Sequence, residues 1–217
     1  MTDKPILFSA PMIRALLAGT KTQTRRKLPS AHPKFPELNV LSLDVLIDPQ
    51  QVWYWDGKHD RVGASYRLPI APGDRLWVKE TWRGSKDYDA YPPREMSHWP
   101  VHYDADGAPD ERDELGMNGR TRSPIHMPRW ASRLTLTVTD VRVQRLQEIS
   151  EADAVAEGCT EGHTVDDISG VHEGWSARTD FRALWNSIHG PDAWNQNPWV
   201  AAYSFTIHRG NIDQMDT

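Results

Sequence analysis

The sequence predicts an α+β fold, in which a small β-barrel carries short helices at its side. Two observations support this class: strand and helix patterns alternate along the chain, and two long irregular stretches interrupt them. The predicted order is strand, helix, strand, insertion, strand, insertion, strand, helix, helix, strand. We expect a single domain over residues 1–217, with insertions at about residues 28–70 and 83–124.

The first strand and helix come before residue 20. Ile6-Leu7-Phe8 is a short apolar run that predicts a strand, and Ser9 is placed to cap the following helix. Gly19 stands where a left-handed residue ends a helix. Between Ser9 and Gly19, apolar side chains recur at helical spacing: Met12, Ile13, Leu16 and Leu17.

The two insertions lack a regular pattern. Residues 28–70 carry five prolines, and only Val52-Trp53-Tyr54-Trp55-Asp56-Gly57 predicts a short hairpin there. Residues 83–124 are rich in proline, glycine and aspartate. Loops of this length are uncommon inside a compact domain unless they are functional or disordered.

Two further strands lie around the second insertion. A Gly73-Asp74 turn leads into a strand from Arg75 to Trp82. Later, Leu134, Leu136 and Val138 alternate, but Val141 and Val143 continue with the opposite parity. In a regular strand, side chains alternate between the two faces with a strict period of two, and this change of parity breaks that alternation. We therefore expect a β-bulge or a strand break near Thr139-Asp140.

Two helices and a strand complete the predicted fold. Ser150 caps a short helix that runs through Glu157, with Asp153 in a position like that of a capping box and Gly158 as terminator. Thr179 or Asp180 starts the next helix, and residues 198–207 form the last strand. The apolar face of the second helix is predicted to consist of Phe181, Leu184, Trp185 and Ile188.

Composition excludes several classes of function. The formal net charge is −5 and the pI is near 6.0, whereas proteins that coat duplex nucleic acid are usually strongly basic. A nucleoside, a short single strand or one flipped base remains compatible. No apolar run approaches the roughly 20 residues that cross a bilayer, and the lone Cys159 is typical of a reducing cytoplasm. We therefore expect a cytoplasmic protein that does not enter a membrane.

No cofactor or metal is expected. The chain has no phosphate-binding Walker loop and no G-x-G-x-x-G motif, and its nine histidines show no zinc-binding spacing. One cysteine cannot supply a multi-thiolate metal site. The sequence makes no prediction of the oligomeric state.

The segment Gly19-Thr20-Lys21-Thr22-Gln23-Thr24-Arg25-Arg26 concentrates amine, hydroxyl and guanidinium groups. From Arg14 to Lys27, both included, there are five cationic side chains and no acidic one, which suits a polar, anionic ligand. The odd spacing of Lys21 and Thr24 would send them to opposite faces of a regular strand. Either the backbone turns or bulges there to join them in one site, or the segment is an exposed edge strand with solvated cations.

Thr24 could act as a nucleophile only if a base accepts its proton. For Lys21 to be that base at neutral pH, its pKa must fall about three units, roughly 4 kcal/mol of differential destabilisation of the charged form. Burial and the neighbouring Arg25 and Arg26 would lower that pKa, whereas a close Glu157 would raise it. Glu157 itself ends a helix, where a carboxylate is unfavourable by about 0.3–1 kcal/mol. It either points to water or reaches a cation, for which Lys21 is the natural candidate.

Other arginines and tryptophans have open roles. The arginines around Ser123–Pro128 could bind phosphate or be solvated: Arg120, Arg122, Arg129 and Arg133. Trp53, Trp55 and Trp99 lie in the insertions, where they could stack on a base or pack the loops. The tryptophans within predicted elements are expected in the core: Trp77, Trp82, Trp185 and Trp199.

These motifs resemble the ASCH family of PUA-like β-barrels. The resemblance is carried by Gly19-x-Lys21-Thr22-x-Thr24-x-Arg26, by the turn Gly73-Asp74 before a strand, and by the helix Ser150-Glu151…Glu157-Gly158. Two longer runs look like a branch common among phage and prophage proteins: Arg75–Trp82 after its turn, and Ser123–Arg133. The similarity spans about residues 4–208, apart from much of the two insertions.

The resemblance implies a cleft that accepts RNA or a modified nucleoside. Some compact ASCH members are amidohydrolases that remove the acetyl group of N4-acetylcytidine, using a lysine, a threonine and a glutamate that correspond to Lys21, Thr24 and Glu157. Arg26 or Lys79 would then stabilise the oxyanion. The residues expected to bind the substrate or nucleic acid are Arg25, Arg26, Lys79 and Arg129. The alternatives are a binding module for RNA or a modified base without chemistry, and a ribonuclease.

Overall fold

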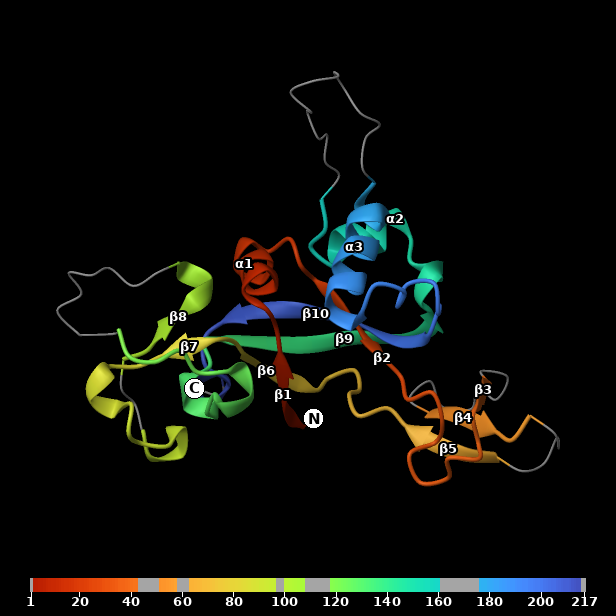
Figure 1. Cartoon of the computed structure of the whole chain (residues 1–217), viewed down its shortest axis with the longest axis horizontal. Helices are drawn as coiled ribbons and strands as arrows, with labels where there is room; N and C mark the ends of the chain where they lie inside the picture. Colours follow the sequence, from red (N-terminus) through yellow and green to blue (C-terminus); the bar gives the residue numbers. More distant parts are fainter. Residues whose placement is uncertain are drawn as a thin grey trace, which may run out of the picture. The chain divides into compact units, whose positions relative to one another are not determined.

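The structure is a computed structural model that describes residues 2–42, 51–57, 63–96, 100–107, 118–160 and 176–215. Within these residues the fold is α+β, with a core made mostly of sheet and with few helices, as predicted (Figure 1). The α-helices are α1 (Ala10–Ala18), α2 (Glu151–Ala156) and α3 (Ala177–His189). None of the described helices is long and apolar enough to span a membrane.

The strands form three sheets. The five-stranded sheet has the order β1 (Asp3–Leu7), β6 (Arg75–Lys79), β9 (Leu134–Arg145), β10 (Trp199–Arg209) and β2 (Gln23–Lys27). Among the described strands, the order of this sheet ends at β1 on one side and at β2 on the other, so the closed barrel stays a prediction. A three-stranded sheet contains β3 (Val40–Ser42), β4 (Gln51–Trp55) and β5 (Gly63–Arg67), and β7 (Trp82–Arg83) pairs with β8 (His102–Tyr103).

The chain divides into two compact units. Unit 1 consists of residues 1–20, 73–138 and 205–217, and unit 2 consists of residues 21–72 and 139–204. Strands β9 and β10 contribute residues to both units.

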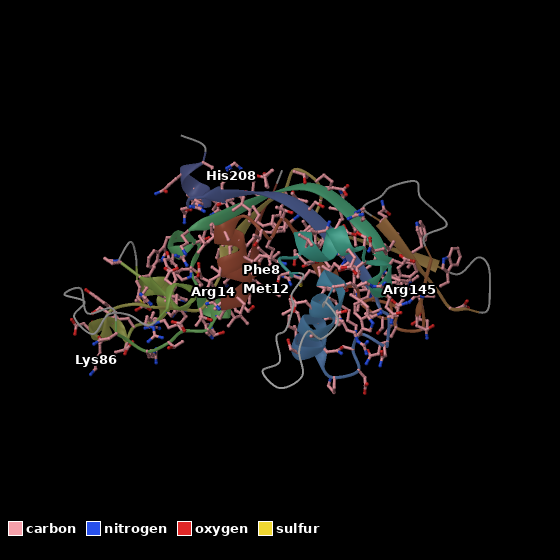
Figure 2. The ribbon with its side chains drawn as sticks, turned by 90° about the horizontal axis from the view of Figure 1, so that it is seen from above. Phe8, Met12, Arg14, Lys86, Arg145 and His208 are labelled. Atoms are coloured by element: carbon pink, nitrogen blue, oxygen red, sulfur yellow. The ribbon has the colours of Figure 1, made fainter. Side chains whose placement is uncertain are left out.

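Unit 1 contains β1, which runs parallel to β6 with Asp3 opposite Arg75, and the first part of β9, which is antiparallel to β6. Helix α1 buries Ile13 and Leu16, and it ends at Gly19, whose φ of 76° is the left-handed conformation predicted for it. Arg14 of α1, labelled in Figure 2, donates to the carbonyl of Ala105 at 3.3 Å. A second apolar cluster in this unit consists of Trp82, Met96, Met127 and Ala131.

Unit 2 holds β2 against the first part of β10, in antiparallel register from Val200 opposite Lys27 to Ser204 opposite Gln23. Helices α2 and α3 lie side by side in it (Figure 1). The Ser150 hydroxyl accepts from Asp153 N–H at 3.1 Å and so caps α2 as predicted. The core of the unit consists of Leu146, Ile149, Ala154, Cys159, Ala177, Phe181, Trp185, Ala193, Trp194 and Val200.

Several predictions are confirmed in detail and others are wrong. The hairpin predicted around residues 52–57 is the β4–β5 pair. Of the two alternatives predicted near Thr139-Asp140, a strand break is wrong, because β9 continues through both residues. The parity shift takes the form of two consecutive exposed side chains, which agrees with the other alternative, a β-bulge. Ile188 is not on the buried face of α3, since 51% of it is exposed. Trp99 lies outside the described residues.

Candidate functional site

The candidate site is built where the chain passes the end of α2 within unit 2. Lys21 and Glu157 form an isolated antiparallel backbone bridge, and Thr22 N–H donates to the carbonyl of Ala156 at 2.8 Å. Glu157 is the C-cap residue of α2, and Gly158 follows it with a φ of 90°. The left-handed glycine ends the helix, so that the Glu157 backbone is free to pair with Lys21.

Lys21 and Glu157 form a buried ion pair. The Lys21 Nζ lies 2.7 Å from Glu157 Oε2, and it also donates to the main-chain carbonyl of Glu157 at 2.8 Å. Exposed fractions are 0% for the Lys21 side chain and 3% for that of Glu157. Of the two fates considered for Glu157, the structure has the contact with Lys21, and the carboxylate does not point to water.

Arg25 joins the same carboxylate from β2. Its Nη1 lies 3.1 Å from Glu157 Oε1 and donates to Gln23 Oε1 at 2.6 Å, and the Gln23 amide donates to Ser204 Oγ at 3.2 Å. On its other side Arg25 Nη2 lies 3.1 Å from Asp153 Oδ2. These contacts make a buried network of two cations and two carboxylates: Lys21, Arg25, Glu157 and Asp153.

Burial and neighbouring charges shift the pKa values of this network. Burial lowers the pKa of the Lys21 amine, and the charge of Glu157 and its hydrogen bond offset this effect only in part, while the charge of Arg26 adds to it. For Asp153, burial raises the carboxyl pKa, but the hydrogen bond from Arg142 and the charge of Arg25 outweigh burial and lower it below its ordinary value. The pKa of Lys21 therefore moves in the direction that a general base requires.

Thr24 lies in β2 opposite Tyr203, and 1% of it is exposed. Side chains alternate along a strand, so Thr24 and Arg26 share the face of β2 opposite to that of Gln23 and Arg25. Arg26 is half-buried; burial lowers its pKa, and the charge of Glu157 acts against this effect. The Arg26 charge is thus close enough to interact with the buried pair electrostatically while sharing the face of Thr24.

The other two predicted site residues belong to unit 1. Lys79 donates to the carbonyl of Ile125 at 2.6 Å, and its amine lies 5.2 Å from the centre of the Trp77 ring. Arg129 makes ion pairs of 2.6 Å with both Asp3 and Asp213.

Two more arginines of the basic cluster around residues 123–128, Arg133 and Arg122, are also engaged within unit 1. Arg133 pairs with Glu80 at 2.9 Å and with Asp106 at 2.7 Å. Arg122 donates to two main-chain carbonyls. These contacts favour a structural role for the cluster over phosphate binding.

The residues missed by sequence reasoning are Gln23, Ser204 and Arg142, which orient the charged groups. One signal for Gln23 was available: Lys21, Gln23 and Arg25 follow each other with a period of two and therefore share a face. Nothing local links Ser204 or Arg142 to the site. In the described part of the chain, no group of three or more His, Cys, Asp or Glu side chains could hold a metal ion.

No family model, no curated protein and no solved structure matches the chain. The resemblance to ASCH proteins therefore rests on the sequence motifs and stays a prediction.

Proposed function

We propose that this protein is a PUA-like hydrolase that cleaves the N4-amide of an acylated cytidine-type nucleoside. The observation that carries the proposal is the burial of the Lys21 amine against the Glu157 carboxylate, three residues before Thr24. Burial lowers the pKa of the Lys21 amine, which is the direction that a general base requires, and a paired carboxylate can orient the amine.

In the proposed reaction, the Thr24 hydroxyl attacks the carbonyl carbon of the acyl group while Lys21, in its neutral form, accepts the hydroxyl proton. This transfer requires the segment to rearrange when substrate binds, because Thr24 lies on the face of β2 opposite to Arg25, which shares the Glu157 carboxylate with Lys21. The carbon–nitrogen bond of the amide then breaks, and the exocyclic nitrogen of the base leaves with that proton as an amino group. Water hydrolyses the resulting threonine ester to release a carboxylic acid and regenerate the hydroxyl. Glu157 keeps the Lys21 amine in place by its hydrogen bond of 2.7 Å.

Arg26 is the residue we assign to the oxyanion. It shares the strand face of Thr24, where negative charge develops on the carbonyl oxygen as the hydroxyl attacks, and a fixed cation in a partly dry site stabilises such charge. Lys79, the other candidate, donates to Ile125 in unit 1, which favours Arg26 for this role.

The test is incubation with N4-acetylcytidine, followed by chromatography for cytidine. Thr24→Val removes the hydroxyl but keeps the shape of the buried side chain, so we expect kcat/KM to fall by about a thousandfold or more. Thr24→Ser keeps a hydroxyl and should retain part of the activity. Thr22→Val removes an exposed hydroxyl two residues away and is the matched control. Full activity in Thr24→Val would reject this mechanism.

A second candidate is a binding module for RNA or a modified base without chemistry. The observation that favours it is that the Lys21 amine is fully buried and bonded to two acceptors of one residue. A buried ion pair of this kind can be structural. This candidate predicts affinity for oligonucleotides that weakens with salt, with no cytidine released.

A further inference from the structure

A basic pocket lies where β2 ends and β10 begins, within unit 2. It has a volume of about 400 Å³. Its polar lining includes Lys27, Ser30, Asn39, Arg145 and Gln196, and Trp199 supplies its aromatic wall. Two of the lining side chains are cationic, and none of the described lining residues is acidic.

The pocket is held together by contacts between strand ends. Leu28 N–H donates to the carbonyl of Trp199 at 2.9 Å, which continues the β2–β10 ladder to the rim of the pocket. Trp199 was expected in the core, but the structure leaves it half-buried. Its ring is therefore part of a surface that a ligand can reach.

Arg145, labelled in Figure 2, is fixed in position before any ligand binds. Its guanidinium carbon lies 4.3 Å from the centre of the Trp199 ring, and its Nη1 donates to the carbonyl of Asn197 at 3.2 Å. Asn197 has a φ of 42°, and its side-chain oxygen accepts from Gln147 N–H at 2.9 Å. An arginine that is already ordered loses less entropy when it binds an anion.

Further charged groups lie around the pocket. Burial lowers the pKa of His189, and the charges of Lys27 and Arg26 lower it further, which places three basic groups near this end of β2. One carboxylate lies beside Arg145: Glu148 Oε2 accepts from the Arg145 N–H at 2.9 Å.

We infer that this pocket binds a phosphate and the adjoining nucleotide of a single-stranded RNA. A guanidinium and an ammonium recognise phosphate oxygens, and an arginine-backed indole offers a planar surface for a base. The inference rests on the proposed function in one respect: it makes the substrate an RNA strand, not a free nucleoside.

The distance between the two sites sets the length of a ligand that would occupy both. Lys27 and Lys21 are six residues apart, which is at most about 20 Å for extended chain. A single ligand that reaches both sites must therefore contain more than one nucleotide.

The test is fluorescence anisotropy with a labelled single-stranded RNA of about 12 nucleotides, within the range of known single-strand sites. We expect the double variant Lys27→Gln/Arg145→Gln to weaken binding at least about tenfold. It should also reduce the slope of log K against log salt by about 0.7, since the pocket holds one phosphate and each lost phosphate contact in a single strand contributes about 0.7. Arg182→Gln, which removes one charge at an exposed position of α3 and so matches Lys27→Gln, should change the affinity less than about twofold.

A single variant and a competition experiment distinguish the remaining explanations of a change in RNA affinity. Lys27→Gln alone changes an exposed side chain, so its effect on affinity can be read even if the Arg145 substitution disturbs the pocket. Cytidine 5′-monophosphate serves as competitor. If it displaced the RNA at a concentration equal to that of the RNA, a single nucleotide would fill the site, and the inference that the ligand is an RNA strand would be rejected.

Binding is measured without turnover, so the two proposals fail separately. RNA affinity that is the same in wild type, Lys27→Gln and the double variant overturns this inference and leaves hydrolysis of N4-acetylcytidine untouched. Affinity that depends on Lys27 and Arg145 supports the pocket, even if wild type releases no cytidine and the hydrolase proposal is rejected.

Discussion

Glu157 shows how an unfavourable local choice is compensated by a distant contact. A carboxylate at the end of α2 faces the negative end of the helix dipole. The cost is offset because the carboxylate receives hydrogen bonds from two buried cations, Lys21 and Arg25. The sequence therefore identified Glu157 because a carboxylate is unfavourable at the end of a helix. Only the structure identified Arg25 as its second partner.

Removing the Glu157 charge should be strongly destabilising. In Glu157→Gln, the amide can accept from one cation, but its NH₂ group must face the other. We expect the free energy of unfolding to fall by about 3–5 kcal/mol, as for a buried pair that loses one partner. Urea unfolding followed by circular dichroism measures the change.

The control for this substitution is Asp140→Asn. That carboxylate is 57% exposed and lies 3.6 Å from Arg142 Nε, so its loss should change stability by less than about 0.5 kcal/mol. If Glu157→Gln were as mild as this control, the Glu157 carboxylate would not be the buried centre of the network.

Cys159, beside the same network, gives a chemical test of burial. It is 5% exposed, and burial, followed by the nearby negative charge of Asp180, raises the pKa of its thiol to about 12. Since the thiolate is the reactive form, alkylation by iodoacetamide at pH 8.5 should be about a thousandfold slower in the native protein than in urea. Mass spectrometry reports on this residue alone, because the chain has one cysteine. Equal rates in the two states would contradict its burial.

At the scale of elements, local sequence rules predicted where most helices and strands lie. Gly19 and Gly158 end α1 and α2 in the left-handed conformation, because an L side chain would be strained there. The wrong predictions concern tertiary packing. Alternation alone could not show that β9 continues past Thr139-Asp140, and helical spacing could not show that Ile188 stays exposed.

The three N-cap serines differ in whether the side chain makes the capping hydrogen bond. Ser150 and Ser176 each accept from a backbone N–H of the first turn, whereas the Ser9 side chain makes no cap hydrogen bond. We expect Ser150→Ala and Ser176→Ala each to lower the free energy of unfolding by about 1 kcal/mol, and Ser9→Ala by less than about 0.5 kcal/mol. Urea unfolding of the three variants measures this order, and equal losses would contradict it.

At the scale of the whole molecule, the sequence predicted the α+β class, but not the division into two units. The chain passes between the units at four places, and two of these lie inside strands, after Val138 in β9 and after Ser204 in β10. The other two follow Thr20 and Pro72. Proline-rich stretches are the usual sequence signal for a boundary, and the two boundaries inside strands have no such signal. The site shows the same limit, since Lys21, Thr24 and Glu157 stand out locally, whereas Ser204 and Arg142 are found only through long-range contacts.

The second acceptor of the Lys21 amine is the main-chain carbonyl of Glu157, an oxygen that no substitution can remove. Position 21 must therefore supply a donor whatever side chain stands at position 157. Exchanging the two residues, lysine for glutamate and glutamate for lysine, would keep the sum of charges but set a carboxylate against a carbonyl oxygen. A chain that keeps this bridge must therefore keep the hydrogen-bond donor at position 21 and the acceptor at position 157.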